Sequence, residues 1–415
     1  MPALNGEWRP AAMSRTENSD PSPVGFETFS YAGIGMSCKL IEPSSLEDLS
    51  NWEELVSGLK GWGDLPENEK VETVSISDDE RGPIAVLGGE SNWIAEFLPW
   101  GSDGKIRKRA KTCEGSCHVP CGGYTWNGAD MIIMWREGHT GGGANVDLGE
   151  SLESGDQGSA IEILTDCGEI LGRYHSKVES SRITPPDPKR WNERIAGIEE
   201  TLRSHSVWRV PHSRDSECVL TIGDVRFQDF IGGAIRIGRP RLSDSLFPPD
   251  CEFPAIRDLA SLVHDLSRLY HETGSELDVV ALRSAVIEGW KRTAPEKWCS
   301  SNVFYSHRGG LAIWEYEQCL LDVIEAVSHQ SGAPQPATTL IGYVPSYQKR
   351  MFNNRTFGAL SIMAGFFGVT SLINTFPPTI EEIQTPIASI IVSALLLRYY
   401  RGLSPPPEVP FTRSV

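Results

Sequence analysis

Two aspartates five positions apart have the clearest chemical potential in this chain of 415 residues. Asp224 follows Gly223 at the end of an apolar run, and Asp229 closes the stretch GDVRFQD. In enzymes that transfer phosphoryl groups, one carboxylate accepts the proton of the attacking hydroxyl. An oxygen ligand a few residues later holds the metal ion that neutralises the phosphates. The spacing therefore predicts Asp224 as a catalytic base and Asp229 as a magnesium ligand.

Phosphoryl transfer also needs groups that contact the phosphates of a nucleotide. The stretch LGGESN places Gly88 and Gly89 in a turn between two expected strands, where the backbone can approach a phosphate closely. The basic run KIRKRAK places Lys108 and Lys111 on what we expect to be the next strand. These four residues are the predicted contacts of ATP.

The elements that must position these residues change in type along the chain. Short apolar runs separated by glycines indicate strands in the first third, whereas a helical period dominates after residue 159. A sheet followed by helices predicts a two-lobed α+β protein. The expected parts are a disordered tail over 1–25, a β-rich lobe with a preceding helix over 26–138, and a helical lobe over 139–335.

Three stretches together resemble one known family, the aminoglycoside phosphotransferase and choline kinase-like branch of the protein-kinase-like fold. They are ILGRYHSKV, TIGDVRFQDF and FPAIRDLASLVHDL. The second resembles the family's catalytic loop, which reads His-Gly-Asp, four residues, then Asn. The resemblance covers about residues 82 to 330. It implies a kinase-like fold that uses ATP and magnesium.

The chain departs from the family pattern at three places. Ile222 stands where the family has histidine, and Asp229 stands where it has asparagine. The second metal-binding aspartate is missing after AIRI, where Gly238, Arg239 and Pro240 follow. An arginine at that position opposes metal binding electrostatically. Two functions stay open: an active small-molecule phosphotransferase, or a pseudokinase that acts as a membrane-held binding or regulatory module.

A second group of residues has the short spacing of a metal site. Cys113, Cys117, His118 and Cys121 lie within the nine-residue stretch CEGSCHVPC, and cysteine and histidine are the usual ligands of zinc. A second pair of ligands displaced along the chain is absent. The four residues are therefore either a zinc site or ordinary thiols and a histidine in a Gly-rich loop.

Two apolar stretches near the C-terminus predict a transmembrane helical hairpin over 356–400. The first runs from Thr356 to Phe376 without a charge, and the second runs from Ile383 to Tyr400. Basic residues flank the pair on its outer sides, whereas the link between the stretches is acidic. The positive-inside rule then places the main body and the tail over 401–415 in the cytoplasm. The alternative is a buried helical pair inside a soluble fold.

The charge and the cysteines limit the partners and the compartment. The net charge is −17, and because the segment from Thr356 onward is neutral, the excess acid belongs to the main body. Such a surface repels nucleic acid. We therefore expect a small-molecule or nucleotide ligand and a membrane, but no nucleic acid. The polar N-terminus and the nine cysteines indicate a reduced, cytosolic interior.

Overall fold

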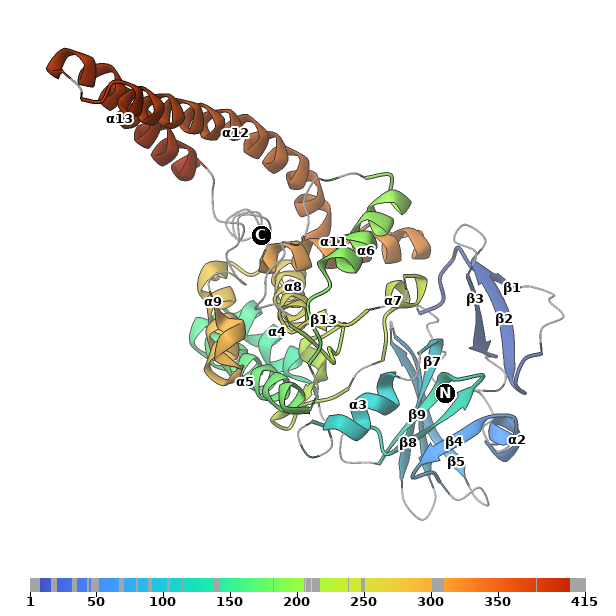
Figure 1. The fold of residues 1–415 in the computed structure, drawn as a ribbon. Coiled ribbons are helices and arrows are strands. Elements are labelled where there is room, and N and C mark those ends of the chain that lie inside the picture. The colour runs from blue at the N-terminus through green and yellow to red at the C-terminus, as the bar shows by residue number, and fades with distance from the viewer. Residues whose placement is uncertain are drawn as a thin grey trace.

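A computed structural model shows an α+β protein with a sheet-rich N-terminal region, a helical C-terminal region and two long apolar helices that project from the body (Figure 1). The structure describes residues 8–15, 21–31, 36–42, 45, 52–66, 71–79, 81–88, 92–102, 105–113, 115, 117–136, 142–181, 183–204, 206, 210, 217–237, 239–247, 251–300, 310–377 and 379–403.

A six-stranded antiparallel sheet forms the core of the N-terminal region, in the order β4-β8-β9-β7-β6-β5. Its strands are β4 (Lys60–Gly63), β5 (Glu72–Asp79), β6 (Gly82–Gly88), β7 (Trp93–Ser102), β8 (Gly122–Trp126) and β9 (Ala129–Arg136). Side chains of β9 alternate between two cores: Ile132 and Met134 on one face, Ile133 and Trp135 on the other. Because both faces are covered, this strand is apolar throughout.

A smaller sheet precedes the main one, and its first strand lies within the segment 1–25, for which we expected disorder. It contains β1 (Ser14–Arg15), β2 (Phe26–Tyr31) and β3 (Met36–Ile41), and helix α2 (Trp52–Ser57) follows it. Trp8 is only 2% exposed, and its ring lies 6.5 Å from that of Trp100. This contact could not be predicted from the polar composition of the segment, because the burial of a single indole ring can anchor an otherwise polar segment.

The basic run between β7 and β8 is helix α3 (Lys105–Cys113), so the expectation of a strand for Lys108 and Lys111 is wrong. Ile106, Ala110 and Cys113 are buried along one face at helical spacing. Lysine, arginine and alanine are good helix formers, whereas β-branched residues are rare in this run. The helix directs its lysines to the protein surface, where Lys108 is 47% exposed and forms an ion pair with Glu252.

Helices dominate the second region. They are α4 (Ala144–Ser154), α5 (Gln157–Ser181), α6 (Pro188–Thr201), α7 (Leu242–Leu246), α8 (Ile256–Glu272), α9 (Val279–Thr293) and α11 (Leu311–His329), with the 3-10 turns η3 (Phe227–Asp229) and η4 (Glu296–Cys299). Two short strand pairs lie among them: β10 (Cys218–Val219) with β13 (Phe253–Pro254), and β11 (Phe230–Ile231) with β12 (Ala234–Ile235). Helix α8 is buried over most of its length and forms the centre of this region.

The two C-terminal helices, α12 (Ala337–Asn374) and α13 (Ile380–Leu403), have different surroundings along their lengths. The start of α12 is buried in the body through Ala337, Leu340 and Val344. Beyond Phe352 both helices are long and apolar enough to cross a membrane, and only 11% of the first and 6% of the second apolar stretch is buried. This exposure argues against a buried helical pair inside a soluble fold.

Candidate functional site

The segment from Ile222 to Asp229, here called the aspartate loop, is held from below by helix α8. Asp258 accepts hydrogen bonds from the backbone nitrogens of Ile222, at 2.8 Å, and Gly223, at 2.9 Å. Asp265 accepts one from the backbone nitrogen of Phe227, at 2.9 Å. Gly223 has a φ of 104°, which favours glycine at this turn. The loop is therefore built into the core.

The structure brings Asp224 and Asp229 to one shared partner, the guanidinium group of Arg81. Nη1 of Arg81 lies 2.8 Å from Oδ1 of Asp229, and Nη2 lies 3.1 Å from Oδ2 of Asp224. All three side chains are at most 5% exposed. Val225 and Phe227 are buried beneath the loop. The two carboxylates face the N-terminal region, but an arginine occupies the position between them.

Arg81 was missed by sequence reasoning because it lies in the turn between β5 and β6. Polar and apolar residues alternate in ETVSIS before this turn and the apolar run PIAVL follows it, which is the signal that could have found the hairpin. The Gly-containing turn predicted at Gly88 and Gly89 lies at the opposite end of β6. Gly88 is the last residue of that strand, and Gly89 lies outside the described residues.

A second arginine fixes the other side of the same turn. Arg239, where the sequence resemblance predicts a metal-binding aspartate, donates to the carbonyl oxygen of Gly82 at 2.8 Å and pairs with Asp79. Its Nε lies 3.8 Å from Glu96 on the central strand β7. Glu96 also pairs with Arg236, and although burial opposes its charge, these two arginines lower the pKa of Glu96.

Burial and pairing set the charges of the aspartate loop. Burial raises the pKa of Asp224 from its usual 3.8 to about 6, outweighing the opposite effect of Arg81 and Arg241. Burial alone would lower the pKa of Arg81, but the charges of Asp229 and Asp224 outweigh burial and raise this pKa. Arg81 therefore stays charged, while Asp224 holds its charge at a cost in stability near neutral pH.

We expect this cost to produce a measurable pH dependence. Because the pKa of Asp224 is higher in the folded state, its stabilising contribution is complete below about pH 4 and is lost as pH rises through about 6. Relative to an Asp224→Asn chain, the wild type should gain free energy of unfolding between pH 7.5 and 5. Histidines such as His329, whose pKa burial lowers, titrate in both chains and cancel in the difference. Chemical denaturation at four pH values measures the difference, and a difference independent of pH would refute the raised pKa.

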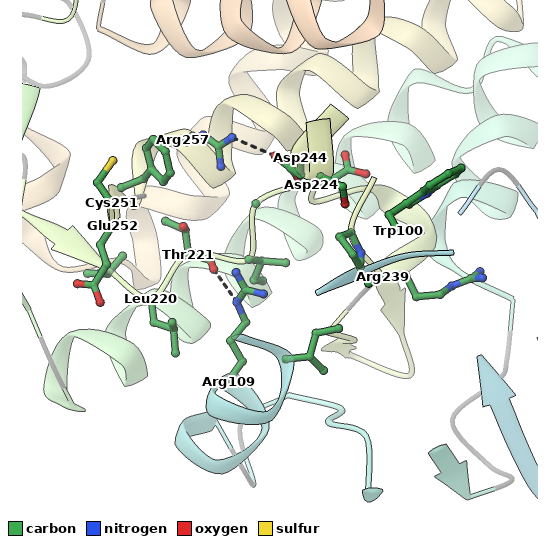
Figure 2. Close-up of a pocket in the computed structure, with 18 of the residues that line it drawn as sticks. Trp100, Arg109, Leu220, Thr221, Asp224, Arg239, Asp244, Cys251, Glu252 and Arg257 are labelled. Atoms are coloured by element: carbon green, nitrogen blue, oxygen red, sulfur yellow. Dashed lines mark hydrogen bonds and ion pairs between the residues drawn. The ribbon is translucent and has the colours of Figure 1, made fainter. Parts of the chain in front are cut away.

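A cavity of about 330 Å³ opens beside the aspartate loop. Figure 2 shows part of its lining: Trp100, Arg109, Thr221, Asp224, Asp244 and Arg257. Arg109, on α3, donates to the carbonyl oxygen of Thr221 at 2.7 Å. Asp244 lies 3.8 Å from Arg257 and 3.3 Å from Arg194. The cavity thus combines aromatic and aliphatic walls with a few fixed charges, which is typical of small-molecule sites.

The predicted zinc ligands do not converge. The thiol of Cys117 donates to the carbonyl oxygen of Cys113, and the thiol of Cys121 donates to that of Met134 at 3.1 Å. Nε2 of His118 lies 3.0 Å from the carbonyl oxygen of Ile231. Among the described residues, no group of three or more His, Cys, Asp or Glu side chains is placed to hold a metal ion. Cys117, His118 and Cys121 each have instead a backbone partner of their own.

A magnesium ion does not fit the arrangement around the aspartate loop. A magnesium ion would need carboxylate oxygens that Arg81 already binds. Arg239 adds a second buried positive charge beside them, and the predicted phosphate contacts Lys108 and Lys111 lie on the outside of α3. The arginines therefore supply internally the positive charge that a metal ion would bring.

No protein-family model matches the chain, and no curated protein matches its sequence. The structure is similar to solved structures of glucosamine kinase. One of them, crystal form B, is 12% identical, with a TM-score of 0.46 over 77% of this chain and 91% of that chain. Another, in complex with glucosamine, ADP and inorganic phosphate, is 14% identical, with a TM-score of 0.47 over 74% and 88%. Similarity at this level assigns no activity to the chain.

Proposed function

We propose that this chain is a catalytically inactive kinase-like protein, a binding or regulatory module held at a membrane by α12 and α13. The observation that carries the proposal is the contact of Arg81 with both Asp224 and Asp229. In a phosphotransferase these carboxylates serve the attacking hydroxyl and the metal ion. In this chain a buried arginine binds both, so the loop keeps its shape without the free oxygens that the reaction needs.

The charge pattern on the sheet supports the same proposal. Protein kinases place a phosphate-contacting lysine on the third strand of the N-terminal sheet. In the meander β5-β6-β7 the third strand carries Glu96, which is buried and bound to Arg236 and Arg239. An ionised carboxylate repels phosphate. Glu96 and Arg239 thus have the opposite charges to the phosphate-contacting lysine and the metal-binding aspartate of an active site.

The cavity beside Thr221 and Ile222 is the site that we propose for a small-molecule ligand of this module. Its volume of about 330 Å³ falls in the range of small-molecule sites, and its mixture of apolar walls and fixed charges suits a ligand with a few polar groups. An active phosphotransferase remains the alternative, and it requires Arg81 to leave its two carboxylates.

ATP turnover by the full chain in detergent tests the proposal. We expect the wild type and the Asp224→Asn chain to turn over ATP at the same background rate, with and without magnesium, across a panel of hydroxyl-bearing acceptors. Equal melting temperatures within a few degrees would show that both proteins are folded. Magnesium-dependent turnover in the wild type that disappears in Asp224→Asn would establish an active enzyme instead.

The membrane part of the proposal predicts a difference in extraction. The full chain should stay with membranes after carbonate and high-salt washes, because two apolar spans insert effectively irreversibly. A chain ending at Arg350 keeps the buried start of α12, including Leu340 and Val344, and should be soluble and monodisperse. Release of the full chain by carbonate would show that the two helices do not span the bilayer.

A further inference from the structure

Positive charge without acidic partners gathers at the base of the helical hairpin, where α12 and α13 approach the body (Figure 1). Lys349, Arg355 and Arg398 are exposed there, and none of these three forms an ion pair with another residue that the structure describes. The sequence has no aspartate or glutamate over 337–380 or over 383–403. These three cations, here called the basic collar, are therefore uncompensated.

The packing of the two helices places the arginines of the collar at one level of the hairpin. The rings of Phe357 on α12 and Tyr399 on α13 lie 5.0 Å apart. Arg355 comes shortly before Phe357, and Arg398 comes directly before Tyr399. Because the helices run antiparallel and each residue adds about 1.5 Å of rise, the two arginines differ in height by only about 5 Å. Their long side chains can reach the same headgroups.

Both arginines also lie at the ends of the stretches that are long and apolar enough to cross a membrane. Arg355 is in the first turn of the stretch Phe352–Asn374, and Arg398 is in the last turn of Ile380–Tyr400. An arginine at such a position extends its guanidinium group to the surface of the bilayer. Tyr399, which is 52% exposed, is of the residue type that favours the same depth. The collar thus belongs at the level of the lipid phosphates.

We infer that the basic collar binds the headgroups of anionic phospholipids in the leaflet nearest the body, an inference that rests on the membrane anchor of the proposed function. Basic side chains near a bilayer surface attract acidic lipids, and guanidinium groups match phosphate oxygens with forked hydrogen bonds. The opposite end of the hairpin carries only the acidic residues Glu381 and Glu382. The preference for acidic lipid is therefore confined to one leaflet.

A lipid suits the collar better than a soluble anion. The collar is an open surface, and a soluble anion would have to bind there from dilute solution. Insertion of the two helices instead holds headgroups beside the collar at a high effective concentration. The chain as a whole carries a net charge of −17, so the collar must supply this attraction against the charge of the body.

Spin-labelled lipids test the inference on the full chain in bilayers of phosphatidylcholine. By electron paramagnetic resonance, the wild type should immobilise spin-labelled phosphatidylserine about three-fold more strongly than spin-labelled phosphatidylcholine at low salt. Added salt should reduce this preference, because it screens charges at the bilayer surface. Combining Arg355→Gln with Arg398→Gln should bring the two lipids close to equality.

A matched control removes two exposed arginines from the body instead. Arg173 and Arg292 both pair with Glu169 on the surface, where they are 55% and 62% exposed. Combining Arg173→Gln with Arg292→Gln changes the net charge as much as the collar variant does. This chain should keep the preference of the wild type.

Equal immobilisation of the two lipids by the wild type would overturn the inference, and so would a preference that survives in the collar variant. If the collar variant does not insert, the wild type alone decides, because a preference that high salt leaves unchanged would also refute a charged site. Carbonate extraction of the same samples separates this failure from failure of the anchor. A chain that resists carbonate but shows no preference contradicts the inference alone, whereas a chain that carbonate releases contradicts the membrane anchor as well.

Discussion

Arg81→Met should remove about 3–5 kcal/mol from the free energy of unfolding at pH 7. The substitution keeps an apolar stem but leaves Asp224 and Asp229 buried beside each other without their shared cation. Uncompensated buried charges are among the most destabilising changes known for folded proteins. Chemical denaturation of the soluble chain ending at Arg350 would measure the loss.

Two further chains separate this effect from a general loss of an arginine. Arg292→Met removes an exposed partner of Glu169 and should cost less than about 1 kcal/mol. Arg81→Met combined with Asp229→Asn should recover part of the stability, because one of the two stranded charges is gone. A cost for Arg81→Met as small as that of Arg292→Met would mean that Arg81 does not neutralise the pair.

Asp258→Ala should be as damaging, at about 3–6 kcal/mol, for a different reason. Its carboxylate accepts from the backbone nitrogens of Ile222 and Gly223 and from Nε2 of His175, and it is fully buried. Removing it strands these donors in the core, and each costs about 1–3 kcal/mol when it is left without a partner. The loss would be read from denaturation midpoints of the chain ending at Arg350.

Asp258→Asn and Asp278→Ala serve as comparisons. The amide keeps one acceptor oxygen, so Asp258→Asn should cost less than the alanine substitution. Asp278 caps α9 at the surface by accepting from the backbone nitrogen of Val280, and its loss should cost about 1 kcal/mol. Equal costs for Asp258→Ala and Asp278→Ala would show that α8 does not anchor the aspartate loop.

Local patterns were enough to find the aspartate loop and the apolar helices. The glycine before Asp224 and the apolar residues Val225 and Phe227 predict a turn anchored from beneath, and the structure buries both apolar side chains. The uncharged run from Thr356 predicts a long apolar helix, and this run lies within α12. The loop and the apolar helix both depend on residues that are close in the sequence, so the spacing of residue types is enough to predict them.

The partners of the loop could not be found in the same way. Arg81 and Asp224 are separated by 143 positions, and only the pairing of β5 with β6 brings the arginine to the carboxylates. The lysines of α3 were expected on a strand, where phosphate-contacting lysines of kinases lie, and this expectation was wrong because the run forms a helix. The charge of a site depends on such long-range contacts, and so the sequence predicts a metal site where the structure contains arginines.

Calorimetric titration of ATP into the full chain, with and without magnesium, tests the central claim most directly. The contacts of Arg81 with both carboxylates predict that magnesium adds nothing to any nucleotide affinity of the wild type, because the oxygens that would hold the ion are already bound. Magnesium-dependent binding of ATP to the wild type, weakened at least ten-fold by Asp229→Ala, would contradict the claim and identify a working metal-nucleotide site.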